Sequence, residues 1–168
     1  NVRRVTKTDC GNGVTCPNEY KDVDGLVTNE KGIVLATFYA DCVPLYIVDK
    51  VNKAIGLSHS GWRGTVNKMG EVTLKKMSVE FGTKPENVNV VIGPSICQDC
   101  YEVSEDVALE FEKNFVRDDL KALQFLSRFY SKDELSEYRI KNALLIKKDN
   151  GKYQLNLWYA NYRVFRDY

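Results

Sequence analysis

The sequence has little histidine, little charge imbalance and no long apolar run. It contains one histidine, and 24 basic residues offset 23 acidic ones to a net charge of +1. The longest apolar stretch, residues 33–40, is far shorter than the ~20 residues that span a bilayer. No basic segment followed by an apolar one opens the chain as a signal peptide would. We therefore expect a cytoplasmic protein that binds neither a membrane nor nucleic acid.

Disulfides are a second expected absence. The chain has five cysteines, Cys10, Cys16, Cys42, Cys97 and Cys100. An odd number cannot pair completely, and five are few for a small secreted protein held together by disulfides, so we expect a reducing compartment. The length of 168 residues predicts about one domain, with a core large enough to be stable without staples. We expect a single domain over residues 1–168. The chain has no initiator Met and begins and ends in patterned sequence, so we also expect that both natural termini are missing.

Strand-like and helix-like patterns are mixed along the chain rather than strictly alternating. Short strands and turns are expected over residues 1–32, and buried strands at 33–39, 44–48, 54–59 and 88–92. Helices are expected at 65–81 with Thr65 as N-cap, at 104–115 with Ser104 as N-cap, and from Leu155 onward, with Leu155, Trp158, Tyr162 and Phe165 on one face. Residues 117–150 read as helix plus loop. The pattern predicts an α+β fold with a mixed β-sheet and packed helices.

The densest group of reactive side chains lies between positions 40 and 64. Cys42 and His59 each stand at the end of a predicted strand, and residues 49–52 form a hairpin-type connection between these strands. Gly61 and Gly64 permit close backbone approach, and Arg63 between them could bind a phosphate or carboxylate at a helix N-terminus. Asp41 could orient His59 or act as a base. The loop after residue 92, which contains Ser95, could form one wall of a pocket.

Each of these residues also has a purely structural interpretation. Cys42 could be a small core residue, and a lone histidine is more often structural than catalytic. Arg63 could close a salt bridge, and Asp41 could simply end a strand. The C-x-x-C pair of Cys97 and Cys100 lacks the second pair that a four-cysteine zinc site needs.

Several motifs together resemble one known family. They are Ala-Asp-Cys-Val-Pro at 40–44, His-Ser-Gly-Trp-Arg-Gly at 59–64, Ile-Gly-Pro-Ser-Ile at 92–96 and Tyr-Glu-Val at 101–103. In this order and spacing they resemble the laccase-domain family, over about residues 1–165. Its members are labelled polyphenol oxidases or multicopper oxidoreductases, and also purine nucleoside phosphorylases with adenosine deaminase and methylthioadenosine phosphorylase activity. The resemblance also implies a fold similar to that of bacterial toxins that deamidate glutamine with a Cys-His pair.

The resemblance implies a zinc ion held by two histidines and one cysteine. Cys42 matches the cysteine ligand and His59 the second histidine, while the first histidine is expected upstream of Asn1. The family's closing Cys-Thr and Tyr-Arg-Arg segments are not present after Tyr168. We assign phosphate and substrate binding to Arg63, Gly61, Gly64 and Ser95, and proton transfer to Asp41.

The expected function is that of a zinc-dependent purine nucleoside enzyme. It would carry out phosphorolysis of adenosine, inosine or methylthioadenosine and deamination of adenosine, with nucleosides and phosphate as its partners. One alternative is a Cys-His hydrolase or deamidase with Cys42 as nucleophile. Another is a laccase-type polyphenol oxidase, but a multicopper cluster needs many more than one histidine, so copper is disfavoured. A non-catalytic purine-binding module is a third, and a homodimer is one of the oligomeric states left open.

Overall fold

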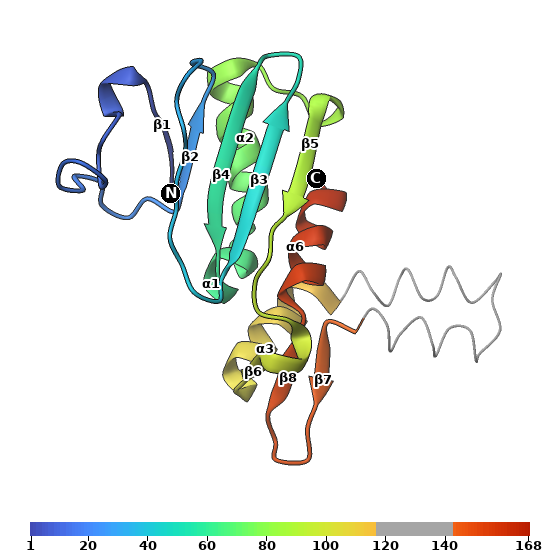
Figure 1. Cartoon of the computed structure of the whole chain (residues 1–168). Coiled ribbons are helices and arrows are strands. Elements are labelled where there is room, and N and C mark those ends of the chain that lie inside the picture. The colour runs from blue at the N-terminus through green and yellow to red at the C-terminus, as the bar shows by residue number, and fades with distance from the viewer. Residues whose placement is uncertain (117–142) are drawn as a thin grey trace. The chain divides into compact units, whose positions relative to one another are not determined.

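A computed structural model describes residues 1–116 and 143–168 (Figure 1). The chain divides into two compact units, one formed by Asn1–Ser95 with Asn161–Tyr168 and the other by Ile96–Ala160. The sequence predicts helix plus loop over residues 117–150, and residues 117–142 of this range lie outside the described residues. Among the described helices, none has the length and apolarity needed to cross a membrane.

The first unit is built on a five-stranded sheet in the order β1-β2-β4-β3-β5. Its strands are β1 (Val2–Arg4), β2 (Gly25–Thr28), β3 (Val43–Asp49), β4 (Ala54–Ser60) and β5 (Val88–Ile92). The β1–β2 pair is parallel and the other pairs are antiparallel. The predicted α+β class with a mixed sheet is therefore confirmed.

The β3–β4 hairpin is the part of the sheet that positions the chemistry. Its seven paired positions run from Asp49 opposite Ala54 to Val43 opposite Ser60. At the turn, the buried Asp49 carboxylate accepts hydrogen bonds from the backbone N–H groups of Val51 (2.9 Å) and Asn52 (3.0 Å). Burial raises the pKa of Asp49, but the side-chain amide of Asn52 and these two backbone N–H groups outweigh it and lower the pKa. The same bonds define where the strands reverse.

Helix α2 (Met69–Phe81) lies across one face of this sheet (Figure 1). The core between them contains Val27, Ile47, Ala54, Leu74 and Met77, with Val2, Phe81, Val88, Val90 and Phe165 packed against it. Gly70 lets the ring of Phe165 pack directly against this helix, since a Cβ there would lie 2.5 Å from Cζ of Phe165. A larger residue at this position would force the ring to move.

Two expected elements of this unit are wrong. Residues 33–39 form no strand, although their side chains alternate between half-buried and exposed, because no neighbouring backbone in the described chain pairs with them. The expected helix 65–81 is two helices, α1 (Trp62–Val66) and α2, since Lys68 adopts a left-handed conformation (φ 55°) between them. Gly61, not Thr65, is the N-cap of α1, and the Thr65 hydroxyl instead donates to the Gly61 carbonyl inside the helix.

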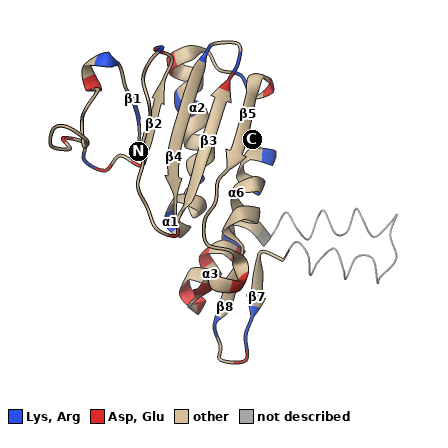
Figure 2. Ribbon diagram, in the orientation of Figure 1, with Lys and Arg blue, Asp and Glu red and all other residues tan. Residues whose placement is uncertain are grey.

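The second unit contains a small sheet in the order β6-β8-β7. Its elements are β6 (Glu102–Val103), α3 (Glu105–Phe111) continued by a π-helix (Glu112–Val116), β7 (Leu145–Lys147) and β8 (Tyr153–Leu155). Acidic residues gather on α3, and lysines flank the turn between β7 and β8 (Figure 2). Ser104 is the N-cap residue of α3, as predicted.

Helix α6 (Leu157–Arg166) differs from the expected last helix. Leu155 belongs to strand β8, so the helix begins two residues later than predicted. Trp158 and Tyr162 are exposed rather than part of the packed face. The buried positions are Leu157, Ala160, Asn161, Arg163 and Val164, because the helix also packs polar side chains inward.

Candidate functional site

Cys42 and His59 meet at the open end of the β3–β4 hairpin. Cys42 directly precedes the first paired residue of β3, and Gly61 directly follows the last paired residue of β4. A Cβ placed on Gly61 would lie 3.0 Å from Sγ of Cys42 and 3.7 Å from Nε2 of His59. The thiol and the imidazole therefore flank one small space that a glycine leaves open, as the hairpin geometry predicts.

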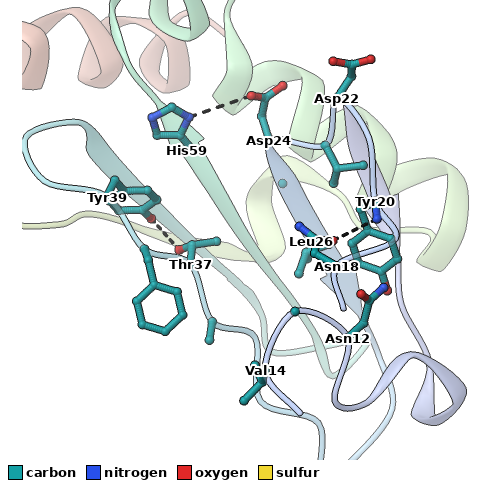
Figure 3. A pocket seen from close by; sticks show the side chains of 15 residues that line it. Asn12, Val14, Asn18, Tyr20, Asp22, Asp24, Leu26, Thr37, Tyr39 and His59 are labelled. Carbon is teal, nitrogen blue, oxygen red and sulfur yellow. Dashed lines mark hydrogen bonds and ion pairs between the residues drawn. The ribbon is translucent and has the colours of Figure 1, made fainter. Parts of the chain in front are cut away.

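The His59 ring is oriented by an acidic and an aromatic neighbour. Nδ1 lies 3.9 Å from Oδ1 of Asp24, and the ring stacks on Tyr39 with centroids 5.1 Å apart and planes at 24° (Figure 3). Thr37 Oγ1 donates a hydrogen bond of 2.7 Å to the Tyr39 hydroxyl. Nε2 and Cε1 are the ring atoms nearest to a Cβ built on Gly61, at 3.7 and 3.8 Å, so this edge of the ring lies toward the space beside Cys42.

Asp24 was not expected in this role. Asp41 is the residue expected from the sequence to orient His59, whereas the carboxylate beside Nδ1 comes from Asp24, directly before β2. The other oxygen of Asp24 accepts a hydrogen bond of 2.8 Å from the backbone nitrogen of Asn1. The place of Asp24 beside His59 follows from the β2–β4 pairing of Gly25 with Ser58, which no local sequence pattern indicates.

Asp41 instead acts on Cys42. Burial raises the pKa of the Cys42 thiol above its ordinary value, and the negative charge of Asp41 raises it further. Asp41 itself is exposed. A thiol in such surroundings keeps its proton at neutral pH unless a cation replaces that proton.

The Cys42–His59 pair has the donor chemistry of a zinc site. Thiolate sulfur and imidazole nitrogen are the ligands that zinc prefers, and a carboxylate behind a histidine ligand is the usual way to fix the ring. Within residues 1–116 and 143–168, no group of three His, Cys, Asp or Glu side chains could hold a metal ion. Among the described residues, this site therefore offers two side chains of the kinds that zinc prefers.

A cavity of about 480 Å³ opens beside His59 (Figure 3). Besides His59, its polar lining residues are Asn12, Asn18, Tyr20, Asp22, Asp24, Thr37 and Tyr39. These side chains come from the loops before β2 and β3, whose sequence carries no periodic signal. Sequence reasoning missed them for that reason. The volume lies within the ~300–1,000 Å³ range of small-molecule sites.

The turn after His59 is held by buried polar contacts. Ser60 Oγ donates to Oδ1 of Asn161 (2.8 Å), Asn161 Nδ2 donates to Oγ1 of Thr65 (3.0 Å), and the two hydroxyls lie 3.0 Å apart. All three side chains are fully buried. A Cβ on Gly64 would lie 3.3 Å from the His59 carbonyl oxygen, so glycine lets α1 pack this close to β4. The network fixes the backbone that carries the histidine.

The residues assigned to phosphate lie outside the cavity lining. Arg63 is exposed, and its guanidinium stacks over the Trp62 ring at 4.4 Å. Ser95 Oγ donates to the Gly93 carbonyl at 3.4 Å. Helix α1 has only five residues, so its dipole adds little to anion binding, and the charge of Arg63 is the main attraction here.

Known proteins resemble this chain in sequence. A sequence model of the family described as "Multi-copper polyphenol oxidoreductase laccase" matches residues 1–168. The chain is 39% identical over 136 residues to the purine nucleoside phosphorylase YlmD of Bacillus subtilis, which covers 79% of this chain and 48% of that protein. It is also 42% identical over 91 residues to "Adenosine deaminase RL5" from an unknown prokaryotic organism, covering 54% of this chain and 34% of that protein.

Solved structures show the same relationship. The crystal structure of YlmD from Geobacillus stearothermophilus superposes with a TM-score of 0.73 and 28% identity, covering 99% of this chain and 54% of that one. The chain therefore spans between about a third and about half of the length of these relatives. The expected likeness to Cys-His deamidating toxins stays a prediction.

Proposed function

The chain belongs to the multi-copper polyphenol oxidoreductase laccase family, and from that premise we propose that it forms part of a zinc-dependent purine nucleoside enzyme. The names of its relatives support nucleoside chemistry, since they include a purine nucleoside phosphorylase and an adenosine deaminase. The proposed reactions are phosphorolysis of purine nucleosides and deamination of adenosine.

One observation carries the proposal: His59 is at once a wall of the cavity and a neighbour of the Cys42 sulfur. A ligand in the cavity would therefore contact the residue that holds the metal. The cavity volume suits a nucleoside, and its hydroxyl, amide and carboxylate groups suit the hydroxyls of a ribose and the polar edge of a purine.

The ligand roles proposed here are for Cys42 and His59, with a further histidine outside the printed sequence as the resemblance implies. When bound, zinc would supply a Lewis acid and lower the pKa of a coordinated water toward 7. Asp24 would keep the His59 ring in the orientation that points Nε2 at the metal. Tyr39 would limit rotation of the same ring through stacking.

Phosphate would bind on the Arg63 side rather than in the cavity. Two carboxylates, Asp22 and Asp24, line the cavity, and no Lys or Arg is among the described residues that line it. A phosphate dianion would be repelled there, whereas the exposed guanidinium of Arg63 can form a bidentate contact. Gly61, Gly64 and Ser95 are the proposed backbone and hydroxyl contacts near that anion, and Asp41 is the proposed proton-transfer group.

A Cys-His hydrolase is the less supported alternative. Such an enzyme needs a thiolate at neutral pH, and both burial and Asp41 favour the protonated thiol of Cys42 in the absence of a metal. A laccase-type oxidase is also disfavoured, because a multicopper cluster needs several histidines and the sequence has one.

A product assay tests the proposal directly. The protein, including the further histidine expected upstream of Asn1, is incubated with adenosine, with and without phosphate, and adenine and inosine are separated by chromatography. Zinc content is measured in the same sample by elemental analysis. We expect zinc to co-purify, adenine to appear only with phosphate, and inosine to appear in either case.

Matched variants separate the zinc hypothesis from the hydrolase. Cys42→Ala should lose both bound zinc and nucleoside turnover, while Cys10→Ala, which changes an exposed cysteine elsewhere, should lose neither. A chelator should reproduce the Cys42→Ala result. Turnover that survives complete metal removal and stops on thiol alkylation would instead establish the hydrolase.

A further inference from the structure

The C-x-x-C pair in the second unit forms a tight turn. Residues Gln98–Cys100 make a single turn of 3-10 helix, and the N–H of Cys100 donates to the carbonyl of Cys97 at 3.2 Å. A turn closed in this way keeps its first and fourth Cα atoms within ~7 Å. A disulfide requires Cα atoms ~4.4–6.8 Å apart, so the turn already brings the two residues to about that separation.

The two residues between the cysteines are anchored from outside the turn. Gln98 Nε2 donates to the Ala143 carbonyl at 2.9 Å, and Asn156 Nδ2 donates to Oε1 of Gln98 at 3.3 Å. Gln154 Nε2 donates to the Asp99 carbonyl at 2.5 Å. None of these bonds involves a sulfur atom, so the turn can keep its shape whether the cysteines carry thiols or a disulfide.

The two thiols are accessible and chemically unequal. Cys97 is half-buried, Cys100 is exposed, and both are free. The Cys100 thiol and the backbone N–H groups of Cys100 and Asp99 lower the pKa of Cys97, whereas the neighbouring Cys97 raises the pKa of Cys100. This difference is the one expected between an attacking and a resolving cysteine.

We propose that the Cys97–Cys100 turn is a thiol–disulfide exchange site whose substrates are low-molecular-weight disulfides of the glutathione type. The Cys97 thiolate attacks one sulfur of the substrate R–S–S–R, forming a mixed disulfide and releasing one thiolate R–S⁻. The Cys100 thiolate, formed as its proton is lost to solvent, then attacks Sγ of Cys97 and releases the second R–S⁻. The protein dithiol loses two electrons, and the substrate disulfide gains them as two thiols.

A metal site explains the pair less well. A structural zinc site takes four ligands, and no third His, Cys, Asp or Glu joins Cys97 and Cys100 in the described part of the chain. The exchange reaction needs only the two sulfur atoms that the turn supplies. The proposal is independent of nucleoside chemistry, because it uses no residue of the Cys42–His59 site.

The test uses the full, reduced chain and oxidised glutathione. After timed incubation and acid quenching, remaining thiols are alkylated and each cysteine is assigned by peptide mass mapping. In the wild-type chain we expect an intramolecular Cys97–Cys100 disulfide. In Cys100→Ser we expect a glutathione adduct that persists on Cys97, formed several-fold faster than the adduct on Cys100 in Cys97→Ser.

Cys10 provides the matched control, because it is an exposed cysteine outside the turn. Cys10→Ser should form the 97–100 disulfide at the wild-type rate, and reduced glutathione in excess should reverse it. The proposal is overturned if wild type keeps stable glutathione adducts on Cys97 or Cys100 without closing the disulfide. Equal adduct rates in the two single variants would overturn the assigned roles of the cysteines.

Discussion

Gly61→Ala is the substitution that most directly separates metal binding from folding. The backbone of Gly61 (φ −70°, ψ −175°) is one that alanine adopts without strain. The added methyl, however, would lie 3.0 Å from Sγ of Cys42 and 3.7 Å from Nε2 of His59. It would occupy the space between the two proposed zinc ligands.

The expected loss of zinc affinity in Gly61→Ala follows from the contact distances. Carbon packs best at ~3.5–4.0 Å from its neighbours, so the Cys42 sulfur must move by about 0.5–1 Å. Metal–ligand distances tolerate only about ±0.2 Å. We expect the zinc affinity to fall by at least the ~10–100-fold typical of disturbed ligand support, which is about 1.4–2.7 kcal/mol. Loss of glycine as the N-cap of α1 should cost the metal-free protein only about 1 kcal/mol or less.

Two measurements check this expectation. Zinc affinity is determined by competition with a chelating indicator, and thermal unfolding is followed on the metal-free protein, where Tm should fall by no more than ~2–4 °C. Ser78→Ala is the control, because Ser78 is exposed on α2 and its position is outside the site. An unchanged zinc affinity in Gly61→Ala would refute the assignment of Cys42 and His59 as ligands of one ion.

Three further substitutions test other parts of the structure. Arg63→Gln should slow phosphorolysis about tenfold or more and spare deamination, because only phosphorolysis uses phosphate; equal losses in the product assay would remove Arg63 from the phosphate site. Asn161→Ala should lower the unfolding free energy by ~1–3 kcal/mol, since its amide bonds two buried hydroxyls; an unchanged Tm would contradict this. Two lysines lower the pKa of Glu102 from 4.5 to about 2, so its stabilising contribution is present above pH 4.5 and is lost as the pH falls toward 2. Glu102→Gln should therefore weaken the acid dependence of unfolding in that window, and acid titrations that superpose on wild type would exclude this contribution.

The strands of the central hairpin could be predicted because their signals are local. Residues 44–48 and 54–59 are short, mostly apolar runs separated by turn residues, and they form β3 and β4. Residues 33–39 have the same kind of composition but lack a partner strand in the described chain, and pairing is not visible in a single segment. The break at Lys68 was missed because a left-handed lysine has no composition signal.

The residues of the candidate site also fall into those that a local sequence pattern predicts and those that it does not. Cys42 and His59 were found because one hairpin connects them, so their proximity follows from short-range pairing. Asp24 and Tyr39 were missed because they reach His59 from outside that hairpin. Asn161 reaches the turn after His59 from a helix about a hundred positions further along the chain, and no periodic pattern predicts such a contact.

The hairpin turn at Asp49–Asn52 has a consequence for the opposite end of the sheet. Seven residue pairs separate this turn from the place where Cys42 and Gly61 lie, a distance of about 24 Å at ~3.4 Å per residue. An insertion or deletion of one residue in the turn would shift one strand by one step and send its side chains to the other face. The position of the site therefore depends on the length of a turn at the other end of the sheet. Any redesign of this turn must keep its number of residues if the Cys42 thiol and the His59 imidazole are to remain close.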